Sequence, residues 1–534
     1  MIRREFLRQT TTGAFAALLP GAANGQASTP QPPAQSVPTT PGFFDVRTFG
    51  AVGDGKTVDT PAVNRAIEAA SSAGGGTVLF PSGEYACYTI RLKSHVALYF
   101  NAGATILAAD VPKEGTTTGG YDPAGPPQPW EAYQDFGHNH WANSLFYGEG
   151  LENVTIAGPG LIWGKGLSRG EAKEPPLAES PGVGNKAIAL KKCRNVVLSD
   201  FSVLMGGHFA ILLTGVDNVL IDGLTIDTNR DGIDIDCCRN VRVTNCIVNS
   251  PWDDAICPKS SFALGYARVT ENIVISNCYV TGLYGIGSLL SGEFALTTYS
   301  QVRKAVGRIK CGTESNGGFK NITITNCIFE GCRGLALETV DGADIQDITV
   351  SNLTMRGVVH SPLFLRLGAR LRGPKGIVPG VLRRVLFSNI VSSGAVAQYP
   401  SIIAGIPGHL VEDVKLDNIF LQQVGGGSKE WASFQPPEKP AGYPEADMFG
   451  TLPATGFFIR HARNIELSNV EIATEAPDAR SAIWAEDVDG LDVFRLRARS
   501  AASAFSLHNL RDFRSFGSRE VPDRKERIVD SLNF

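Results

Sequence analysis

The feature that most constrains this chain is a short segment that recurs along most of its length. Each copy has a polar pair, a run rich in Val and Ile, a turn at Asn, Asp or Gly, and a second short run, as in RNVRVTNCIV (239–248). Copies begin at residues 152, 194, 217, 239, 271, 320, 346, 383, 412 and 463. The starts at 194, 217 and 239 are 23 and 22 residues apart, and the other intervals are longer because loops are inserted. A unit this short cannot bury its apolar side alone, so the copies must stack into one continuous core.

The repeat predicts an all-β parallel β-helix, in which each copy belongs to one turn of a coil. Branched residues favour strands, and Asn favours sharp corners because it tolerates left-handed backbone. A leucine-rich repeat requires an LxxLxLxxN pattern that the copies lack, and a propeller blade requires about 40 residues. We therefore expect a single β-helix domain with inserted loops over residues 43–534.

A short helix is expected to cap the N-terminal end of the coil. Asp59, Thr60 and Pro61 are typical of a helix start, with a capping side chain and an early proline. Residues 62–73 then have amphipathic spacing and are followed by three glycines. The nearby segment GAVGDG (50–55) lacks the GK[ST] ending of a phosphate loop, which makes nucleotide binding the weaker interpretation.

The N-terminal segment predicts export. Residues 1–27 combine a basic head containing Arg3 and Arg4, a short apolar stretch and a small-residue end. The RREFL motif resembles a twin-arginine export signal, with an ordinary secretory signal as the alternative. Residues 28–42 are rich in Pro, Ser and Thr and are expected to form a linker. The mature protein is therefore expected in the periplasm or outside the cell.

The remaining composition bears on partners and on cysteine use. The formal net charge of −4 argues against nucleic acid as a partner. No later segment is long and apolar enough to span a membrane, so no membrane partner is expected, and a monomer is expected. Of the ten cysteines, Cys246, Cys278 and Cys327 occupy the same point of the repeat. This placement favours an inward ladder of small apolar side chains over disulfides or a metal site.

Two acidic clusters occur one repeat apart. Asp231 lies 22 residues before the pair Asp253 and Asp254, so the two clusters should lie on adjacent turns, about 4.8 Å apart. Crowded carboxylates raise the pKa of one member, and a general acid requires such a protonated carboxyl. For Asp231 and Asp234 taken singly, turn capping is the alternative. The arrangement predicts acid/base chemistry on one outer face.

A pair of basic residues, Arg308 and Lys310, follows in a single predicted strand. Side chains two residues apart on a strand point the same way. The two cations would hold an anionic sugar or stabilise the carboxylates, and a solvated surface pair is the alternative.

As an ordered set, these motifs resemble glycoside hydrolase family 28, the polygalacturonases and rhamnogalacturonan hydrolases. The set consists of Asn229-x-Asp231-Gly232, Asp253-Asp254, Arg308-x-Lys310 and the opening FGAVGDG (49–55). The resemblance covers roughly residues 43–480. It implies a right-handed parallel β-helix and single-displacement hydrolysis with inversion. It also implies that Asp253 is the general acid, that Asp231 and Asp254 activate water, and that Asn229, Arg308 and Lys310 bind substrate. No metal or other cofactor is expected.

The chain departs from the family pattern at two places. Arg230 stands where the family usually has Thr. The family's Gly-His-Gly is absent, and Tyr284 or Gly282 falls at its position. The loss of that His, which supports a catalytic Asp in the family, affects the substrate rather than the chemistry. Tyr284 is therefore a candidate substrate-binding residue, as is His208, one turn before Asp231.

The sequence predicts a hydrolase that cleaves α-glycosidic bonds of pectic, galacturonic-acid-containing polysaccharide or oligosaccharide. Inversion requires the acid and the base to be about 6.5–9.5 Å apart. An added loop at residues 292–307 would close one end of the groove and favour action on chain ends. Two alternatives remain open. One is a pectate or pectin lyase, which needs Ca²⁺ or a basic residue; the other is an inactive carbohydrate-binding β-helix, which the missing His favours.

Overall fold

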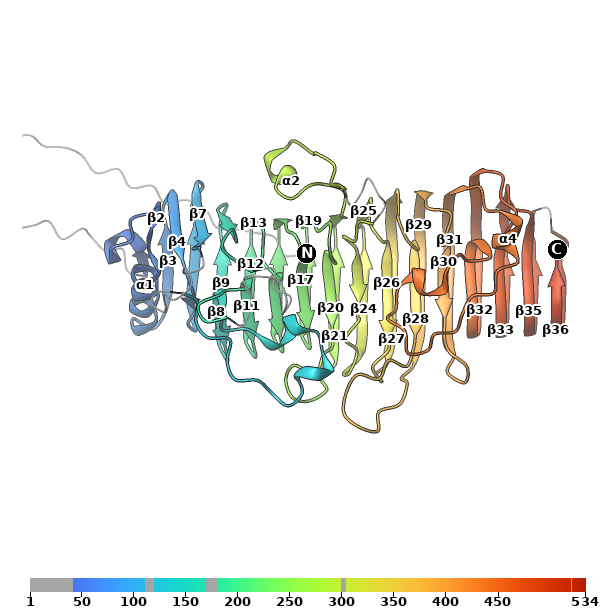
Figure 1. Ribbon diagram of the computed structural model, residues 1–534, viewed down its shortest axis with the longest axis horizontal. Coiled ribbons are helices and arrows are strands. Elements are labelled where there is room, and N and C mark those ends of the chain that lie inside the picture. The colour runs from blue at the N-terminus through green and yellow to red at the C-terminus, as the bar shows by residue number, and fades with distance from the viewer. Residues whose placement is uncertain (1–41, 111–119, 169–179, 299–303, 520) are drawn as a thin grey trace, which may run out of the picture. The chain divides into compact units, whose positions relative to one another are not determined.

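The computed structural model describes residues 42–110, 120–168, 180–298, 304–519 and 521–534. The predicted export signal and residues 28–41 of the linker lie outside these ranges. From residue 42 onward the chain winds as a parallel β-helix, with successive turns stacked side by side (Figure 1). The predicted fold class is therefore confirmed.

In the middle of the coil the turns contribute strands to three parallel sheets, here called sheets A, B and C, and from β27 (Ile345–Arg356) onward one long strand continues both sheet B and sheet C. Sheet A consists of β8 (Ser144–Glu149), β11 (Lys186–Lys191), β14 (Phe209–Thr214), β17 (Asp231–Asp236), β20 (Ile256–Lys259), β23 (Ile309–Cys311), β26 (Leu335–Thr339), β28 (Leu363–Leu367) and β30 (Ser401–Ala404). Sheet B consists of β9 (Glu152–Ala157), β12 (Arg194–Ser199), β15 (Asp217–Asp222), β18 (Arg239–Thr244), β21 (Thr270–Ser276), β24 (Phe319–Thr325), β27 (Ile345–Arg356), β29 (Leu382–Ala395) and β31 (Val411–Gly425). Sheet C consists of β7 (Ala104–Ala108), β10 (Leu161–Trp163), β13 (Ser202–Leu204), β16 (Thr225–Asp227), β19 (Ile247–Asn249), β22 (Tyr279–Thr281) and β25 (Ile328–Glu330).

The two ends of the coil differ from its middle. The N-terminal turns contain β1 (Phe43–Asp45), a 3-10 helix η1 (Val46–Phe49), β2 (Asp54–Val58), α1 (Thr60–Ser72), β3 (Gly76–Phe80), β4 (Gly83–Cys87), β5 (Ile90–Arg91) and β6 (Val96–Phe100). The C-terminal turns contain the long strands β32 (Ala454–Ala476), β33 (Ser481–Phe494), β34 (Arg497–Arg499) and β35 (Ser503–Phe516). The last strand, β36 (Arg524–Asn533), pairs antiparallel with β35, so the parallel stack ends there.

The core follows from the alternation of side chains along each strand. On β17, Ile233 and Ile235 are fully buried in the core, so Asp234 and Asp236 point to the outer face of sheet A. The predicted cysteine ladder is confirmed, because Cys246, Cys278 and Cys327 are free thiols buried in the same core.

Corner asparagines link neighbouring turns. Asn218, Asn240 and Asn272 have φ between 57° and 61°, the left-handed conformation predicted for the corners. The side-chain amide of Asn240 donates to Asn218 at 3.0 Å, and that of Asn272 donates to Asn240 at 3.0 Å. The repeat unit thus supplies both the turn and a hydrogen bond between turns.

The predicted capping helix is present as α1, but Asp59 does not cap it. Asp59 already has helical backbone angles (φ −87°, ψ −5°), and its side chain makes no bond to the helix start. Its carboxylate instead accepts the N–H groups of Val52 and Gly53 at 2.7 and 2.9 Å. The glycine-rich segment at 50–55 is therefore tied to the helix by a buried carboxylate.

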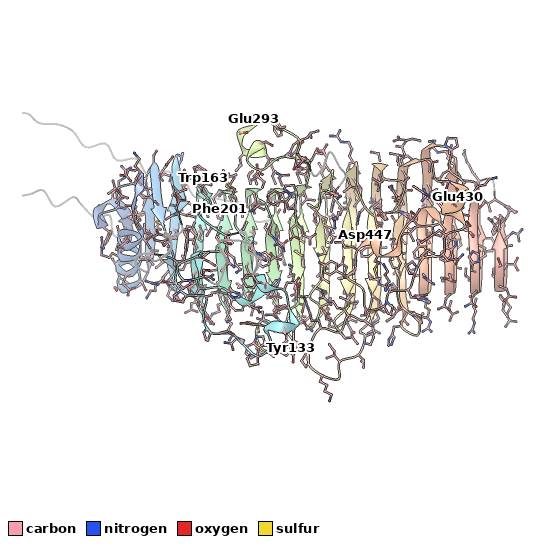
Figure 2. All side chains as sticks on the ribbon, in the orientation of Figure 1. Tyr133, Trp163, Phe201, Glu293, Glu430 and Asp447 are labelled. Atoms are coloured by element: carbon pink, nitrogen blue, oxygen red, sulfur yellow. The ribbon has the colours of Figure 1, made fainter. Side chains whose placement is uncertain are left out.

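Inserted loops lie over the outer face of sheet A. They contain the 3-10 helices η2 (Glu131–Tyr133), η3 (Phe136–Asn139) and η4 (Ala446–Phe449), and the short helix α4 (Lys429–Ala432). The loop carrying α2 (Ser288–Ser291) leaves sheet C instead, so Glu293 and Tyr133 lie at opposite edges of the strands (Figure 2). Within the described ranges, no helix has the length and apolar character needed to cross a membrane.

Candidate active site

The candidate site lies where the chain passes from sheet C into sheet A on two neighbouring turns. Asp231 begins β17, and Asp253 and Asp254 come just before β20. The N–H of Gly232 donates to the carbonyl of Asp254 at 3.0 Å, which fixes the two turns side by side. The prediction that these acids lie on adjacent turns is confirmed.

The three carboxylates lie close together. One oxygen from each of Asp231, Asp253 and Asp254 lies within 4.8 Å of the others. The pitch of the coil brings Asp231 next to the pair, and Asp253 and Asp254 are direct neighbours in the sequence. Inversion with an acid and a base about 6.5–9.5 Å apart stays a prediction.

Only one of the three acids reaches solvent to a useful extent. The side chain of Asp253 is 27% exposed, whereas those of Asp231 and Asp254 are 2% and 1% exposed. A substrate therefore meets Asp253 first.

Two buried cations hold Asp254. The Nε of Arg308 donates to its Oδ1 at 2.7 Å, and the Nζ of Lys310 lies 2.5 Å from its Oδ2. Ile309 and Cys311 point into the core, so Arg308 and Lys310 share the outer face, as the alternation predicted. Both cations thus stabilise a carboxylate, which was one of the two roles considered for them.

Arg308 is also fixed by a residue that sequence reasoning missed. Its two Nη atoms donate to Glu445 at 3.1 and 2.6 Å, while its Nε serves Asp254. Glu445 comes from the loop between β31 and β32, and it also pairs with Arg333 at 3.1 Å. No local pattern marks Glu445, because 137 residues separate it from Arg308. The guanidinium of Arg308 is therefore committed to two carboxylates.

Lys259 performs the corresponding role for Asp231 and was also missed. Its Nζ lies 2.8 Å from Asp231 Oδ2 and 3.1 Å from Asp234 Oδ1, and its side chain is 7% exposed. A signal existed, because Lys259 is paired in register with Asp236 and alternates on β20 toward the face that carries Asp234. In a chain that lacks the family's supporting His, Lys259 is the cation that contacts Asp231.

The pKa values within the cluster run opposite to the prediction for Asp253. Burial, together with the negative charges of Asp234 and Asp253, raises the pKa of Asp231 well above its ordinary value. Burial also acts to raise the pKa of Asp253. The guanidinium of Arg230 at 3.0 Å and a hydrogen bond with Asp231 outweigh burial, so the pKa of Asp253 is lowered. A proton bound by the cluster in the free protein therefore favours Asp231 over Asp253, the predicted general acid.

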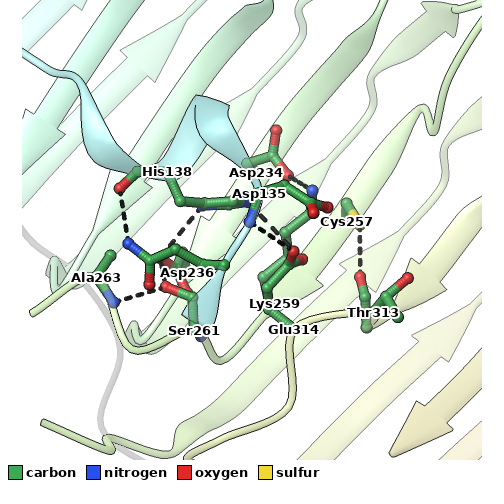
Figure 3. A network of polar contacts seen from close by, with 12 residues as sticks. Asp135, His138, Asp234, Asp236, Cys257, Lys259, Ser261, Ala263, Thr313 and Glu314 are labelled. Atoms are coloured by element: carbon green, nitrogen blue, oxygen red, sulfur yellow. Dashed lines mark hydrogen bonds and ion pairs between the residues drawn. The ribbon is translucent and has the colours of Figure 1, made fainter. Parts of the chain in front are cut away.

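A second buried network supports Lys259 from the far side (Figure 3). His138, from the loop carrying η3, has its Nδ1 3.5 Å from Asp236 and its Nε2 3.9 Å from Glu314. Asp236 also accepts the N–H and the hydroxyl of Ser261 at 2.8 and 2.7 Å. Despite burial, the positive charge of Lys259, together with the nearby His138, holds the pKa of Glu314 well below its ordinary value.

The same network joins two loops that are distant in the sequence. Arg372 donates to Asp135 at 2.7 Å and to Glu314 at 2.6 Å. The loop at residues 130–141 is thereby held against the loop that follows β28. These contacts fix Lys259 and its surroundings, so the position of Asp231 depends on segments far from it in the chain.

The other predicted substrate-binding residues lie around this centre. Asn229 is buried and accepts a hydrogen bond from the hydroxyl of Thr228 at 3.3 Å. His208 is 3% exposed, with its ring 4.6 Å from that of Phe209 and 6.0 Å from that of Phe136. Both residues are covered by protein, and their contact with a substrate stays a prediction.

Tyr284 lies at the edge of the site rather than among the acids. Its N–H donates to Asn249 Oδ1 at 3.3 Å, and its ring is 5.6 Å from that of Phe294. The loop it begins is tied down by buried Asp227, which accepts the N–H groups of Gly287 and Leu289 at 2.9 and 3.1 Å. A role for Tyr284 in substrate binding also stays a prediction.

Two parts of the chain match models of known protein families. Residues 130–302 match Glycosyl hydrolases family 28, and residues 43–156 match Rhamnogalacturonase A/epimerase, pectate lyase-like. A probable polygalacturonase of Vitis vinifera is 26% identical over 334 residues, which cover 58% of this chain and 60% of that protein.

Two solved structures share the fold. The family 28 exopolygalacturonase of Yersinia enterocolitica superimposes with a TM-score of 0.57 at 19% identity, covering 84% of this chain and 78% of that one. The exopolygalacturonase of Thermotoga maritima gives 0.54 at 18% identity, covering 84% of this chain and 93% of that one. The first family match contains Asn229, Asp231, Asp253 and Asp254 in the predicted order. This part of the chain is therefore similar to glycosyl hydrolases family 28.

Proposed function

We propose that this protein hydrolyses glycosidic bonds of pectic, galacturonic-acid-containing polysaccharide or oligosaccharide. The observation that carries the proposal is the acid cluster, in which solvent-facing Asp253 stands beside buried, cation-paired Asp231 and Asp254. The family match and the grape relative, whose name is probable polygalacturonase, support the same reaction class.

The proposed reaction uses one water molecule and two proton transfers. Asp253 donates its proton to the glycosidic oxygen as the bond from that oxygen to the anomeric carbon breaks. Water attacks the anomeric carbon and gives a proton to the carboxylate of Asp231 or Asp254. The products are two sugars, one with a new free reducing end, and the enzyme regains its starting state when the carboxyl that received the proton releases it and Asp253 takes one up. We propose inversion at the anomeric carbon, on the basis of the family resemblance.

A lyase is the second candidate, and the charges around the cluster argue against it. A Ca²⁺-dependent lyase requires carboxylates whose charge the ion neutralises. Here Asp231, Asp253 and Asp254 are each paired with Arg230, Lys259, Arg308 or Lys310. Cationic side chains of the protein therefore neutralise the carboxylates, which favours acid/base hydrolysis.

Replacement of Asp253 by Asn tests the proposal. The general acid contributes roughly 10²–10⁴-fold, so the variant should release reducing ends from polygalacturonate at a rate lower by about that factor. Asp347→Asn, which alters a surface pair with Arg384 on sheet B, is the matched control and should keep full activity. Unchanged release in Asp253→Asn would remove the hydrolase assignment, and an unsaturated-uronate absorbance band would establish the lyase instead. NMR of the first anomeric protons formed distinguishes inversion from retention, and the sizes of the products distinguish action on chain ends from internal cleavage.

We also propose export of a monomer, on the basis of the RREFL motif and the segment that follows it. Arg3→Lys together with Arg4→Lys should leave the precursor in the cytoplasm if the signal is of the twin-arginine type. Export of that double variant at the normal level would instead indicate the ordinary secretory route. Sedimentation of the mature protein tests the monomer.

A further inference from the structure

Of the ion pairs described for Asp231, Asp253 and Asp254, the one between Arg230 and Asp253 is the most exposed to solvent. The side chains of Arg230 and Asp253 are 24% and 27% exposed, and Arg230 Nη2 lies 3.0 Å from Asp253 Oδ2. The other cations that pair with the acids, Lys259, Arg308 and Lys310, are 7%, 2% and 5% exposed. Any sugar that reaches Asp253 therefore meets Arg230 as well.

The fold fixes the backbone of Arg230 and leaves its head group at the mouth of the site. Its carbonyl accepts the hydroxyl of buried Ser250 at 2.7 Å, which ties the turn between β16 and β17 to the turn next to it. Its side chain then crosses to Asp253, 23 residues later in the chain. A guanidinium presents a planar fork of N–H donors that matches the two oxygens of a carboxylate.

We propose that Arg230 binds the carboxylate of the uronic acid unit at the cleavage point, and that it releases Asp253 when it does so. This inference rests on the proposed hydrolase function and names its substrate class, an anionic sugar. The substrate carboxylate replaces Asp253 as the partner of Arg230, so one ion pair is exchanged for another. A neutral sugar makes no such exchange and leaves Asp253 paired.

The exchange of ion pairs gives Asp253 the role of acid and Asp231 the role of base by moving a single proton. The groups that face Asp253 are Arg230, Asp231, Lys310 and Lys259. While Arg230 stays on Asp253, its charge lowers the pKa of Asp253, so a proton bound by the cluster favours Asp231. Once Arg230 moves to the substrate, that proton passes from Asp231 to Asp253, and the number of protons in the cluster is unchanged. Asp253 becomes the protonated acid and Asp231 becomes the carboxylate that receives a proton from water.

Arg230→Thr, the residue type usual at this position in the family, tests the inference on two substrates. One is an oligogalacturonide with free carboxylates, and the other is the same oligosaccharide fully methyl-esterified. The loss of one charge-assisted hydrogen bond weakens binding by roughly ten- to 100-fold, so kcat/KM on the acidic substrate should fall by about that factor. On the neutral ester, kcat/KM should stay level or rise. Equal losses on both substrates, or no loss on the acidic one, would overturn the inference.

Three further variants guard against a merely structural effect. Arg239→Thr removes a surface arginine whose partner on sheet B is Glu271, and it should change neither value. Arg230→Lys keeps the charge and should retain part of the preference for the acidic substrate, whereas Arg230→Gln should lose it. If Arg230→Thr does not fold, the inference is tested by comparing Arg230→Lys with Arg230→Gln. An equal preference for the acidic substrate in those two variants would contradict the inference.

A binding measurement separates this inference from the hydrolase proposal. Titration calorimetry with free galacturonate requires no turnover. The wild type should bind it at least about tenfold more tightly than Arg230→Thr does. Binding that depends on Arg230 in a protein that hydrolyses nothing would keep this inference and remove the proposed reaction. If wild type and Arg230→Thr both hydrolyse the substrates with the same preference for the acidic one, the proposed reaction stands and the role of Arg230 is contradicted.

Discussion

The guanidinium of Arg308 bridges two carboxylates, donating from Nε to Asp254 at 2.7 Å and from both Nη atoms to Glu445 at 3.1 and 2.6 Å. Glu445 belongs to a loop that returns across sheet A, and Asp447 of that loop lies over the strands in Figure 2. The orientation of Asp254 thus depends on a loop that joins the site only in the folded chain.

Replacing Glu445 by Gln should lower both stability and turnover. Removing one partner of a buried ion pair costs about 3 kcal/mol, because the remaining charge loses its compensation. Arg308 would then turn away from Asp254, so kcat should fall more than KM changes. Urea unfolding and steady-state kinetics measure the two effects. Glu430→Gln, on exposed α4 of the same loop, is the control, and equal behaviour of the two variants would show that Glu445 has no positioning role.

Replacing Lys259 by Met should shift the pH dependence of the reaction. Lys259 lowers the pKa of Asp231, so its removal lets that pKa, already raised by burial, rise further. The carboxylate form of Asp231 would then appear only at higher pH, and the acid-side limb of the kcat/KM profile should move upward. Lys415→Met, which alters a surface pair with Glu466, provides the comparison. A profile identical to that of wild type would mean that Asp231 is not the base.

Glu338, one turn beyond Lys310, should make stability depend on pH. Burial raises its pKa to about 7 from 4.5, against the opposing charges of Lys310 and Arg308. Since the folded-state pKa is the higher one, this group stabilises the fold fully below pH 4.5, and the contribution is lost as pH rises through about 7. Its size is about 3 kcal/mol. Glu338→Gln should therefore lose less stability than wild type between about pH 5 and pH 8 in urea unfolding. An equal loss in both proteins would contradict the assignment.

The ten cysteines should react only after unfolding. All are buried free thiols, and a buried thiol is shielded from thiol reagents. A chromogenic disulfide reagent should therefore detect no thiol in the native protein and ten per chain in denaturant without reductant. A smaller number in denaturant would indicate disulfides formed after export.

Several features of the site followed directly from sequence spacing. Repeat copies 22 to 23 residues apart placed Asp231 next to Asp253 and Asp254, because one repeat is one turn. Alternation on β23 placed Arg308 and Lys310 on one face. The same logic would have identified Lys259, which shares the outer face of β20, had its register with Asp236 been considered.

The capping prediction for Asp59 failed for a local reason. An aspartate before Thr-Pro is typical of a helix cap, but the carboxylate found two N–H groups of the preceding loop instead. These partners, Val52 and Gly53, lie seven and six residues before Asp59, on the side away from the helix start that a cap would serve. Local sequence preference therefore identified the helix and not the bond that anchors it.

The sequence by itself determined the parallel coil, the inward cysteine ladder, the asparagine corners and the adjacency of the three acids. All of these depend on periods along the chain, which a strand and a turn convert directly into positions. Only the tertiary structure decided which cation pairs with which carboxylate: Arg230 with Asp253, Lys259 with Asp231, and Arg308 with both Asp254 and Glu445. Those pairings join different turns and distant loops, and burial and the paired cations together shift the pKa values of the carboxylates, so no local pattern contains that information.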